Sequence, residues 1–359
     1  MEALLMMEIL VILLELKYPV YHRRPIESSV VELEESGGTC LAIKHVFKMN
    51  ERFDTRKAFL LTRKRLTHDI TLVHGINRKG GIWKKKRLRT IRDVLYCTNR
   101  SLRKSAREVL TWIENSDIER LREGTGARDA ELLFCVDPSH INYLDIETTG
   151  MRDARIFLVA LGILNVPANT LETVQFLARN LDEEYMVCKQ TLDMLKRYPC
   201  MISYNGKAFD GKVLDERFFY YFNTGIDDIL EHHVDLLHEV RHFTGASKCV
   251  KLGDVERSIL RAPRSGDIPS RDIPDAYQLF INAGNHDSFT RYLSEVFQVG
   301  DNNVMNSSKL VGDSETSRAF FDMYRVIHHN FIDILSLHSI LMKILQTVHA
   351  GLITGCRRC

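Results

Sequence analysis

The stretch YLDIETTG, residues 143–150, combines an apolar strand pattern with two acidic residues. Residues i and i+2 of a β-strand point to the same face, so Asp145 and Glu147 are predicted to project together from a strand end. Two adjacent carboxylates repel each other unless one is protonated or a cation lies between them. A solvated strand end is the alternative interpretation, and this stretch alone does not decide between the two.

Two later motifs contribute further acidic residues. SYNGKAFD, residues 203–210, predicts a short strand, a polar loop and a helix that starts at Asp210. IHHNFIDILSLHSIL, residues 327–341, places His329 and Asp333 four apart on one face of an otherwise apolar helix. An inward histidine alone is more often a core residue, but one beside several carboxylates is better explained by a metal.

The four carboxylates suit hard divalent cations, and we therefore predict two Mg²⁺ or Mn²⁺ ions as cofactors. Two such ions roughly 4 Å apart can bind the attacking and leaving oxygens of a phosphodiester. His329 is then the candidate general base, because an imidazole titrates near neutrality. The predicted metal ligands are Asp145, Glu147, Asp210 and Asp333.

The surrounding pattern predicts an α/β fold with a mixed sheet flanked by helices. Strands are predicted at 142–147, 156–165, 172–178, 200–205 and around His233–Leu236. Helices are predicted at 182–198, from Phe209, and after a polar loop at 300–316. Residues 29–47 form two β-rich runs joined across Gly37-Gly38, which predicts a hairpin in the N-terminal region.

The three motifs together resemble the DEDD 3′–5′ exonucleases of the ribonuclease H-like fold, most closely the YprB ribonuclease H-like branch. DIET at 145–148, YNGKAFD at 204–210 and HNxxD at 329–333 carry the resemblance. The intervening segments HVDLL at 233–237 and LGDVERSIL at 252–260 are also similar, so the resemblance spans about 140–345.

This resemblance implies a role for each matched residue. Asp145, Glu147 and Asp333 would bind the first metal, Asp145 and Asp210 the second, and His329 would be the base. His328 is the alternative base, which we disfavour because His329 shares the helical face of Asp333. Asn205 and Lys207 of the second motif are candidates for substrate contact. Glu256 resembles a recurrent family residue, with a helix-capping or a structural ion-pair role as the alternatives.

The net charge of +2 is unevenly distributed. Between Arg78 and Arg107, twelve Lys or Arg face one acid, Asp93, which leaves about −9 for the remaining residues. This block predicts a polyanion-binding region at 1–135, before a ribonuclease H-like domain at 136–359. Segment 70–115 faintly resembles a helix-hairpin-helix module, although Asn77 replaces its second glycine. The predicted nucleic-acid contacts are Lys84, Lys85, Lys86 and Arg87. Trp83 is predicted to be a core residue, with stacking on a base as the alternative.

The remaining features narrow the class of protein. The 359 residues have an ordinary globular composition, 45% hydrophobic and 27% charged. The apolar start, residues 1–16, lacks basic residues and is interrupted by Glu8 and Glu15, which favours a buried or amphipathic helix over a signal peptide or membrane span. Eight scattered cysteines are typical of a reducing compartment, and the Cys356-x-x-Cys359 pair lacks a second ligand pair for zinc.

We therefore expect a cytoplasmic, metal-dependent 3′–5′ exonuclease whose partner is DNA or RNA, with no membrane or protein partner. A nucleic-acid-binding protein that has lost catalysis, or an accessory proofreading subunit, is the alternative.

Overall fold

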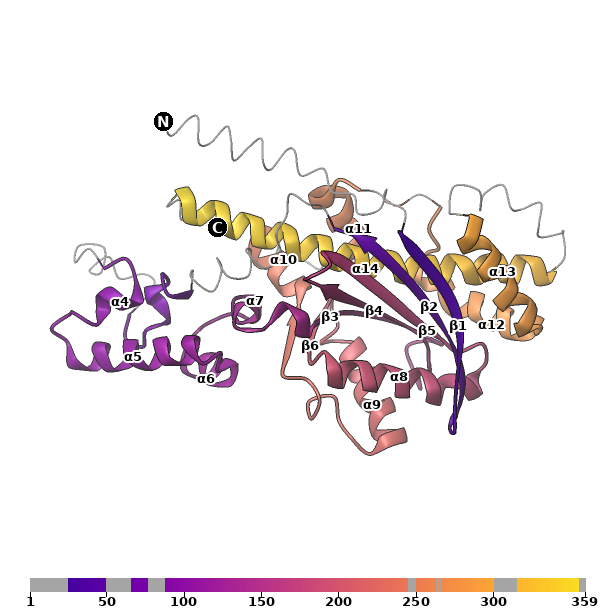
Figure 1. Cartoon of the computed structure of the whole chain (residues 1–359), viewed down its shortest axis with the longest axis horizontal. Helices are drawn as coiled ribbons and strands as arrows, with labels where there is room; N and C mark the ends of the chain where they lie inside the picture. Colours follow the sequence, from indigo (N-terminus) through magenta and orange to yellow (C-terminus); the bar gives the residue numbers. More distant parts are fainter. Residues whose placement is uncertain are drawn as a thin grey trace.

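The computed structural model describes residues 25–49, 66–76, 88–244, 250–262, 264, 266–299 and 315–354, and within these ranges seven strands form one mixed sheet (Figure 1). In chain order the strands are β1 (Glu27–Glu35), β2 (Gly38–Lys48), β3 (Ile141–Thr148), β4 (Ile156–Asn165), β5 (Thr170–Leu177), β6 (Cys200–Ser203) and β7 (His232–Asp235). Their order across the sheet is β1-β2-β5-β4-β3-β6-β7. Only the β3–β6 and β6–β7 pairs are parallel. The predicted α/β fold with a mixed sheet is confirmed.

Helices cover both faces of the sheet (Figure 1). The long helix α14 (Glu315–Thr354) runs along one face, and α8 (Glu184–Arg197) and α9 (Asp210–Phe222) lie on the other. Four further segments follow β7, namely α10 (Leu236–Thr244), α11 (Leu252–Val255) with a π-helical turn (Glu256–Leu260), α12 (Ile273–Ala283) and α13 (His286–Val299). Helix α12 packs beside α14, and α13 lies against β1.

Strand β3 divides its side chains between the two helical layers. Leu144 and Ile146 are buried in the apolar cluster that also contains residues of α8. Tyr143 and Asp145 instead face α14, where His338 and Asn330 are their respective hydrogen-bond partners. The alternation that places Tyr143 on the α14 side therefore places Asp145 and Glu147 there as well.

Helix α14 lies very close to the sheet at Gly162 of β4. A Cβ atom at this position would lie 2.5 Å from Cγ2 of Ile334 on α14 and 3.3 Å from Cδ2 of Tyr143. Any side chain here would therefore push the helix away. Gly162 thus helps to set the distance between α14 and the strand that carries the two acidic residues.

The β1–β2 hairpin forms as predicted, but its place in the fold differs from the prediction. We assigned it to the N-terminal region; in the structure, β2 pairs with β5, with Leu41 opposite Leu177, and so extends the central sheet. Residues 40–43 are completely buried, so this segment belongs to the core of the α/β fold. The alternating pattern of a strand predicts its turn partner but not a partner that lies far away in the chain.

A helical lobe precedes β3 and contains α4 (Ile91–Val94), α5 (Arg100–Glu114), α6 (Ile118–Gly124) and α7 (Asp129–Leu132). The apolar face predicted for this segment is buried, as the positions of Leu102, Ala106, Val109, Leu110 and Ile113 show. The lobe contacts the sheet region through Arg122, which lies 2.7 Å from His232, and Arg128, which donates to Glu239 at 3.0 Å.

Several predictions fall outside the described residues. These are the N-terminal helix, Asn77, Trp83, the four cations Lys84, Lys85, Lys86 and Arg87, most of the 300–316 loop, and the Cys356/Cys359 pair. The domain division at residue 135 remains a prediction. No helix in the described part of the chain is long and apolar enough to cross a membrane.

Candidate active site

Asp145 and Glu147 project from β3 toward α14. Oδ2 of Asp145 accepts a hydrogen bond of 2.8 Å from Nδ2 of Asn330. The same Asn330 amide accepts a 2.9 Å hydrogen bond from Gln175 of β5, whose Nε2 also donates to the carbonyl of Ile327 at 2.9 Å. Buried amide contacts therefore tie α14 to β5 and β3 where the two carboxylates emerge.

Asp210 is brought to the same place by the loop between β6 and α9. Asp235 holds this loop by accepting hydrogen bonds from the backbone N–H groups of Asn205 at 2.8 Å and Lys207 at 3.2 Å. A Cβ atom at Gly206 would lie 2.2 Å from Oγ of Ser203, so only glycine fits here. Asp210 is 6% exposed, and its Oδ1 accepts a 3.3 Å hydrogen bond from the Ile146 N–H. The turn thus joins the second acidic motif to the first.

His329 and Asp333 occupy one face of α14, as their spacing predicts. They are 7% and 8% exposed, and Nε2 of His329 lies 3.7 Å from Oδ2 of Asp333. His328 instead lies between the rings of Tyr324 and Phe331, at centroid distances of 6.1 and 6.5 Å. The structure therefore places His329, and not His328, beside the carboxylates.

The carboxylates lie close enough to affect one another's ionisation. Burial first, and then the charges of Asp333, Glu147 and Asp210, raise the pKa of Asp145 well above its usual range. Burial and the neighbouring charges of Asp333 and Asp210 raise the pKa of Glu147 to about 8. Burial likewise raises the pKa of Asp210 to about 7, even though two backbone N–H groups oppose the shift. This crowding of buried negative charge favours the binding of protons or cations.

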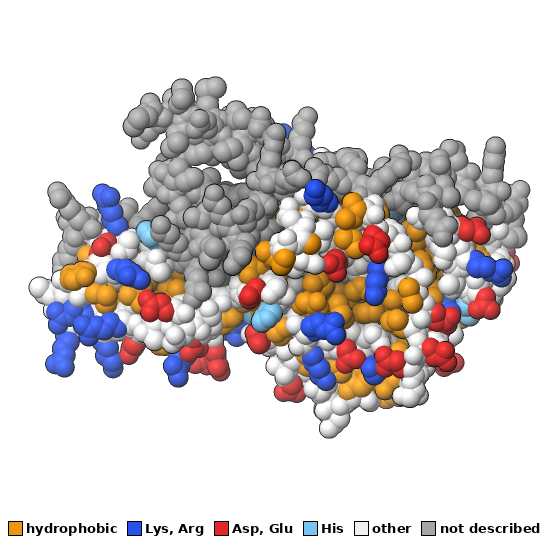
Figure 2. Space-filling model, viewed as in Figure 1, with side chains coloured by type: hydrophobic (Ala, Val, Ile, Leu, Met, Phe, Trp, Pro, Cys, Tyr) orange, Lys and Arg blue, Asp and Glu red, His pale blue; other side chains and the backbone are white. Residues whose placement is uncertain are grey.

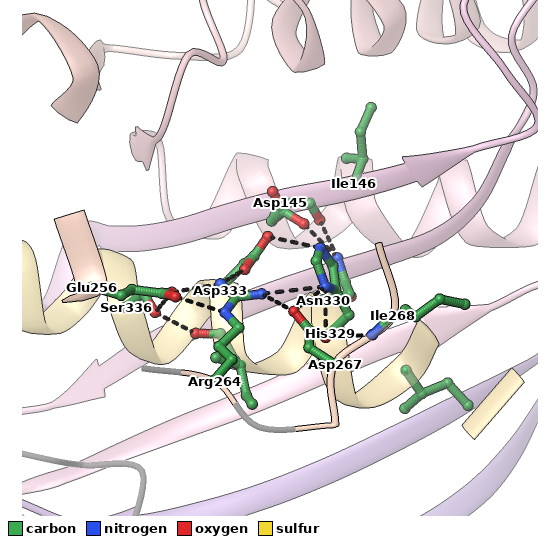
Figure 3. A network of polar contacts seen from close by, with 12 residues as sticks. Asp145, Ile146, Glu256, Arg264, Asp267, Ile268, His329, Asn330, Asp333 and Ser336 are labelled. Atoms are coloured by element: carbon green, nitrogen blue, oxygen red, sulfur yellow. Dashed lines mark hydrogen bonds and ion pairs between the residues drawn. The ribbon is translucent and has the colours of Figure 1, made fainter. Parts of the chain in front are cut away.

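An arginine that we did not predict completes the cluster (Figure 3). Arg264 donates to both oxygens of Glu256, with Nε–Oε2 at 2.7 Å and Nη2–Oε1 at 2.5 Å, and also to Oδ1 of Asp333. Its Nη1 lies 3.2 Å from Oδ2 of Asp267 and 3.2 Å from Nδ1 of His329. Among the roles considered for Glu256, the structure shows the buried ion pair.

Asp267 is a second residue of the cluster that we did not predict. Its two carboxylate oxygens lie 2.8 and 2.9 Å from Nδ1 of His329, which orients the imidazole. Burial lowers the pKa of His329, but the Asp267 contact and the charges of Asp333 and Glu147 outweigh it and raise the value to about 9. The imidazole is therefore protonated at neutral pH in this arrangement. A cation on the carboxylates would reduce the negative charge responsible for that shift.

The predicted substrate residues of the second motif lie at the edge of the site. Asn205 is exposed and has a left-handed backbone conformation, with φ of 63°. Lys207 is exposed as well, and its Nζ forms an ion pair of 2.5 Å with Asp129 of α7. Its charge is therefore already partnered by the helical lobe.

The donor chemistry of the site fits a divalent cation, whereas its present geometry does not. Four buried or half-buried carboxylates meet here, and hard cations prefer such oxygen ligands. Within the described ranges, however, no three Asp, Glu, His or Cys side chains are already arranged to hold a metal ion. Asp333 is engaged by Arg264 instead.

The comparison with known protein families agrees with the fold. Residues 142–345 match the RNase H superfamily, and the chain therefore belongs to that superfamily. The match extends from β3 through His329 and Asp333, so it contains every predicted metal ligand. Members of this superfamily are generally hydrolases that act on nucleic acids, and they typically depend on divalent metals. No curated protein matches the chain.

Proposed function

We propose that the protein is a divalent-metal-dependent 3′–5′ exonuclease of the DEDD type, similar to the YprB branch. The observation that supports this most strongly is the meeting of Asp145, Glu147, Asp210 and Asp333 from one strand and two helices, where burial and mutual repulsion raise the pKa of three of them. Such a cluster would destabilise a core that had only a structural role, because uncompensated buried charges lower the stability of a fold.

The residues divide into ligands and a base. Asp145, Glu147 and Asp333 would hold one Mg²⁺ or Mn²⁺, and Asp145 with Asp210 would hold a second. Two such ions supply Lewis-acid polarisation of the phosphodiester and a more acidic water. His329 would accept the proton of that water at Nε2, since its Nδ1 contacts Asp267. Asn330 and Asp267 hold Asp145 and His329 in place through direct side-chain contacts.

The helical lobe is the proposed substrate-holding surface. Lys and Arg side chains gather along the outer edge of this lobe (Figure 2). Its exposed cations, in α4, α5 and their flanks, are Arg89, Arg92, Arg100, Lys104 and Arg107. Tyr96 is 89% exposed between Arg92 and Arg100, so its ring is available to stack on a base. Lys84, Lys85, Lys86 and Arg87, which lie outside the described residues, remain predicted phosphate contacts on the evidence of their charge alone.

One observation favours a second candidate, a nucleic-acid-binding protein without catalysis. Arg264 already neutralises Asp333, as a permanent structural ion pair would. In that case the carboxylates would not bind a cation, and the helical lobe alone would account for nucleic-acid binding. The two candidates differ in whether Mg²⁺ or Mn²⁺ produces cleavage.

A polarity assay tests the proposal. Single-stranded DNA, duplex DNA and RNA, each labelled at the 5′ end, would be incubated with the full-length protein and Mg²⁺ or Mn²⁺. We expect a ladder of products that shorten from the 3′ end, and protection when the last 3′ linkages are phosphorothioates. Binding without cleavage under every condition would favour the second candidate.

A further inference from the structure

Arg264 is held in the site by a partner that is not a predicted metal ligand. Glu256 is completely buried and receives two hydrogen bonds from the guanidinium. Oγ of Ser336, on α14 three residues after Asp333, donates a further hydrogen bond of 2.5 Å to Oε1 of Glu256. Bidentate contacts of this kind fix a guanidinium more firmly than a single bond does. Glu256 can therefore retain Arg264 whether or not Asp333 stays bonded to it.

Arg264 contacts Asp333 through one hydrogen bond, in contrast to its two hydrogen bonds with Glu256. It uses Nη2, the same nitrogen that contacts Glu256, and it engages Oδ1 of a carboxylate predicted to bind a cation. The other carboxylate oxygen, Oδ2, is on the side of His329. A guanidinium at hydrogen-bonding distance and a divalent cation cannot share Asp333 without strong repulsion at such short range.

We propose that Arg264 is the resident counter-ion of Asp333, and that its guanidinium and a divalent cation compete for this carboxylate. The inference rests on the proposed function, since it takes Asp333 as a metal ligand. Arg264 then neutralises Asp333 before the cation binds, and Glu256 keeps the guanidinium nearby afterwards. The contact between Arg264 and Asp333 is the arrangement that this competition predicts before a cation binds.

The competition has a measurable consequence for metal affinity. When only a fraction of the molecules has Asp333 released from Arg264, the apparent dissociation constant rises by the reciprocal of that fraction. Removal of the guanidinium should therefore strengthen metal binding. A merely structural arginine would have the opposite effect, because its loss would disorder Asp333 and weaken binding.

The test is a calorimetric titration of Mn²⁺ into the metal-stripped, full-length protein. Arg264→Gln should lower the Mn²⁺ dissociation constant by about 5- to 150-fold, the usual range of coupling between two sites. Arg264→Lys, which keeps a charge but lacks the planar fork, should lie between this variant and the wild type. Arg217→Gln is the matched control, since Arg217 forms a similarly bidentate pair with buried Glu184 on the other face of the sheet. It should not change the dissociation constant.

A second variant guards against misfolding. Arg264→Gln leaves buried Glu256 without a counter-ion, so the double variant Glu256→Gln/Arg264→Gln removes both charges and should fold. It should bind Mn²⁺ more tightly than the wild type as well. Unchanged or weaker binding in the folded variants, while wild-type binding still depends on Asp145, would overturn the competition alone. If no Asp145-dependent binding occurs in any of these proteins, the proposed metal function fails, and the competition with it.

Discussion

Nδ1 of His329 lies 2.8 Å from Oδ1 of Asp267, and this contact joins a loop carboxylate to the histidine of the predicted third motif. The pairing leaves Nε2 on the side of Asp333, 3.7 Å from its Oδ2. An imidazole held at one nitrogen and open at the other has the geometry of an oriented base. The adjacent residues His328 and His329 therefore have different environments.

This difference allows a direct comparison of two adjacent substitutions. His329→Ala should retain metal and substrate binding but lower turnover by about 10²–10⁴-fold, the usual contribution of a general base. His328→Ala is the control and should remain close to wild type, because His328 packs among Tyr324 and Phe331. Single-turnover cleavage rates measure the effect. An inactive His328→Ala beside an active His329→Ala would show that the base lies five residues before Asp333.

The role of Asp267 can be separated from that of the base itself. Asp267→Asn removes a negative charge but keeps a hydrogen-bond acceptor, so the imidazole remains in place with a weaker preference for its present orientation. We expect a loss in turnover of about 10–100-fold, with little change in KM, because Asp267 acts through His329. Asp272→Asn, at the exposed end of the short 3₁₀ helix before α12, is the control. A rise in KM with unchanged turnover would instead assign Asp267 to substrate binding.

The basic block between Arg78 and Arg107 should determine the affinity for nucleic acid and not the rate of cleavage. Replacement of Lys84, Lys85, Lys86 and Arg87 by alanine should weaken nucleic-acid binding and reduce its salt dependence, by a slope of about 0.7–0.9 for each phosphate that is no longer neutralised. Fluorescence anisotropy at several salt concentrations measures that slope. Alanine at the exposed cations Lys196, Arg197 and Arg271, outside the helical lobe, should leave the slope unchanged. If the four-alanine variant kept the wild-type salt slope, as the control does, the four cations would be solvated side chains that contact no phosphate.

A buried histidine outside the carboxylate cluster should make the fold sensitive to acid. Burial lowers the pKa of His338 to about 3, and its Nδ1 is paired with the Tyr143 hydroxyl. The unfolded chain binds this proton below about pH 6.5 and the folded protein does not, so stability should fall as the pH decreases from 6.5 toward 3. The effect should be absent above pH 6.5.

Urea unfolding at pH 7 and pH 5 measures this contribution. His338 should account for about 2 kcal/mol of the loss in the wild type between these values, and His338→Gln should lose correspondingly less. Exposed His140 serves as the control, since His140→Gln should retain the wild-type pH dependence. Equal losses in His338→Gln and the wild type would show that another group titrates.

The parts of the site that local periodicity encodes were predictable from the sequence. Strand alternation placed Asp145 and Glu147 on one face, and helical spacing placed His329 beside Asp333. The apolar run at 156–165 was correctly predicted as a strand, and the structure buries it along almost its whole length.

The parts that depend on distant pairing were not predictable. Arg264 and Asp267 lie on a loop without periodic pattern, and their neighbours on α14 follow more than sixty residues later. Asn330 could have been noticed, because it shares the helix of the third motif, but nothing local connects it to Asp145. The hairpin was assigned to the wrong region for a similar reason, since the pairing of Leu41 with Leu177 is formed only by the tertiary fold.

Metal-dependent hydrolysis by the carboxylate cluster can be tested at Asp145, the residue shared by both predicted ions. Wild-type protein and Asp145→Asn would be compared on one end-labelled oligonucleotide, with Mn²⁺ and with chelator. Asparagine at this position keeps the size of the side chain and can still pair with Asn330, while it removes the charge. We expect rapid shortening only for the wild type with Mn²⁺, with equal substrate binding by the two proteins. Equal cleavage by Asp145→Asn, or wild-type cleavage that persists in chelator, would show that the cluster does not act through a bound metal.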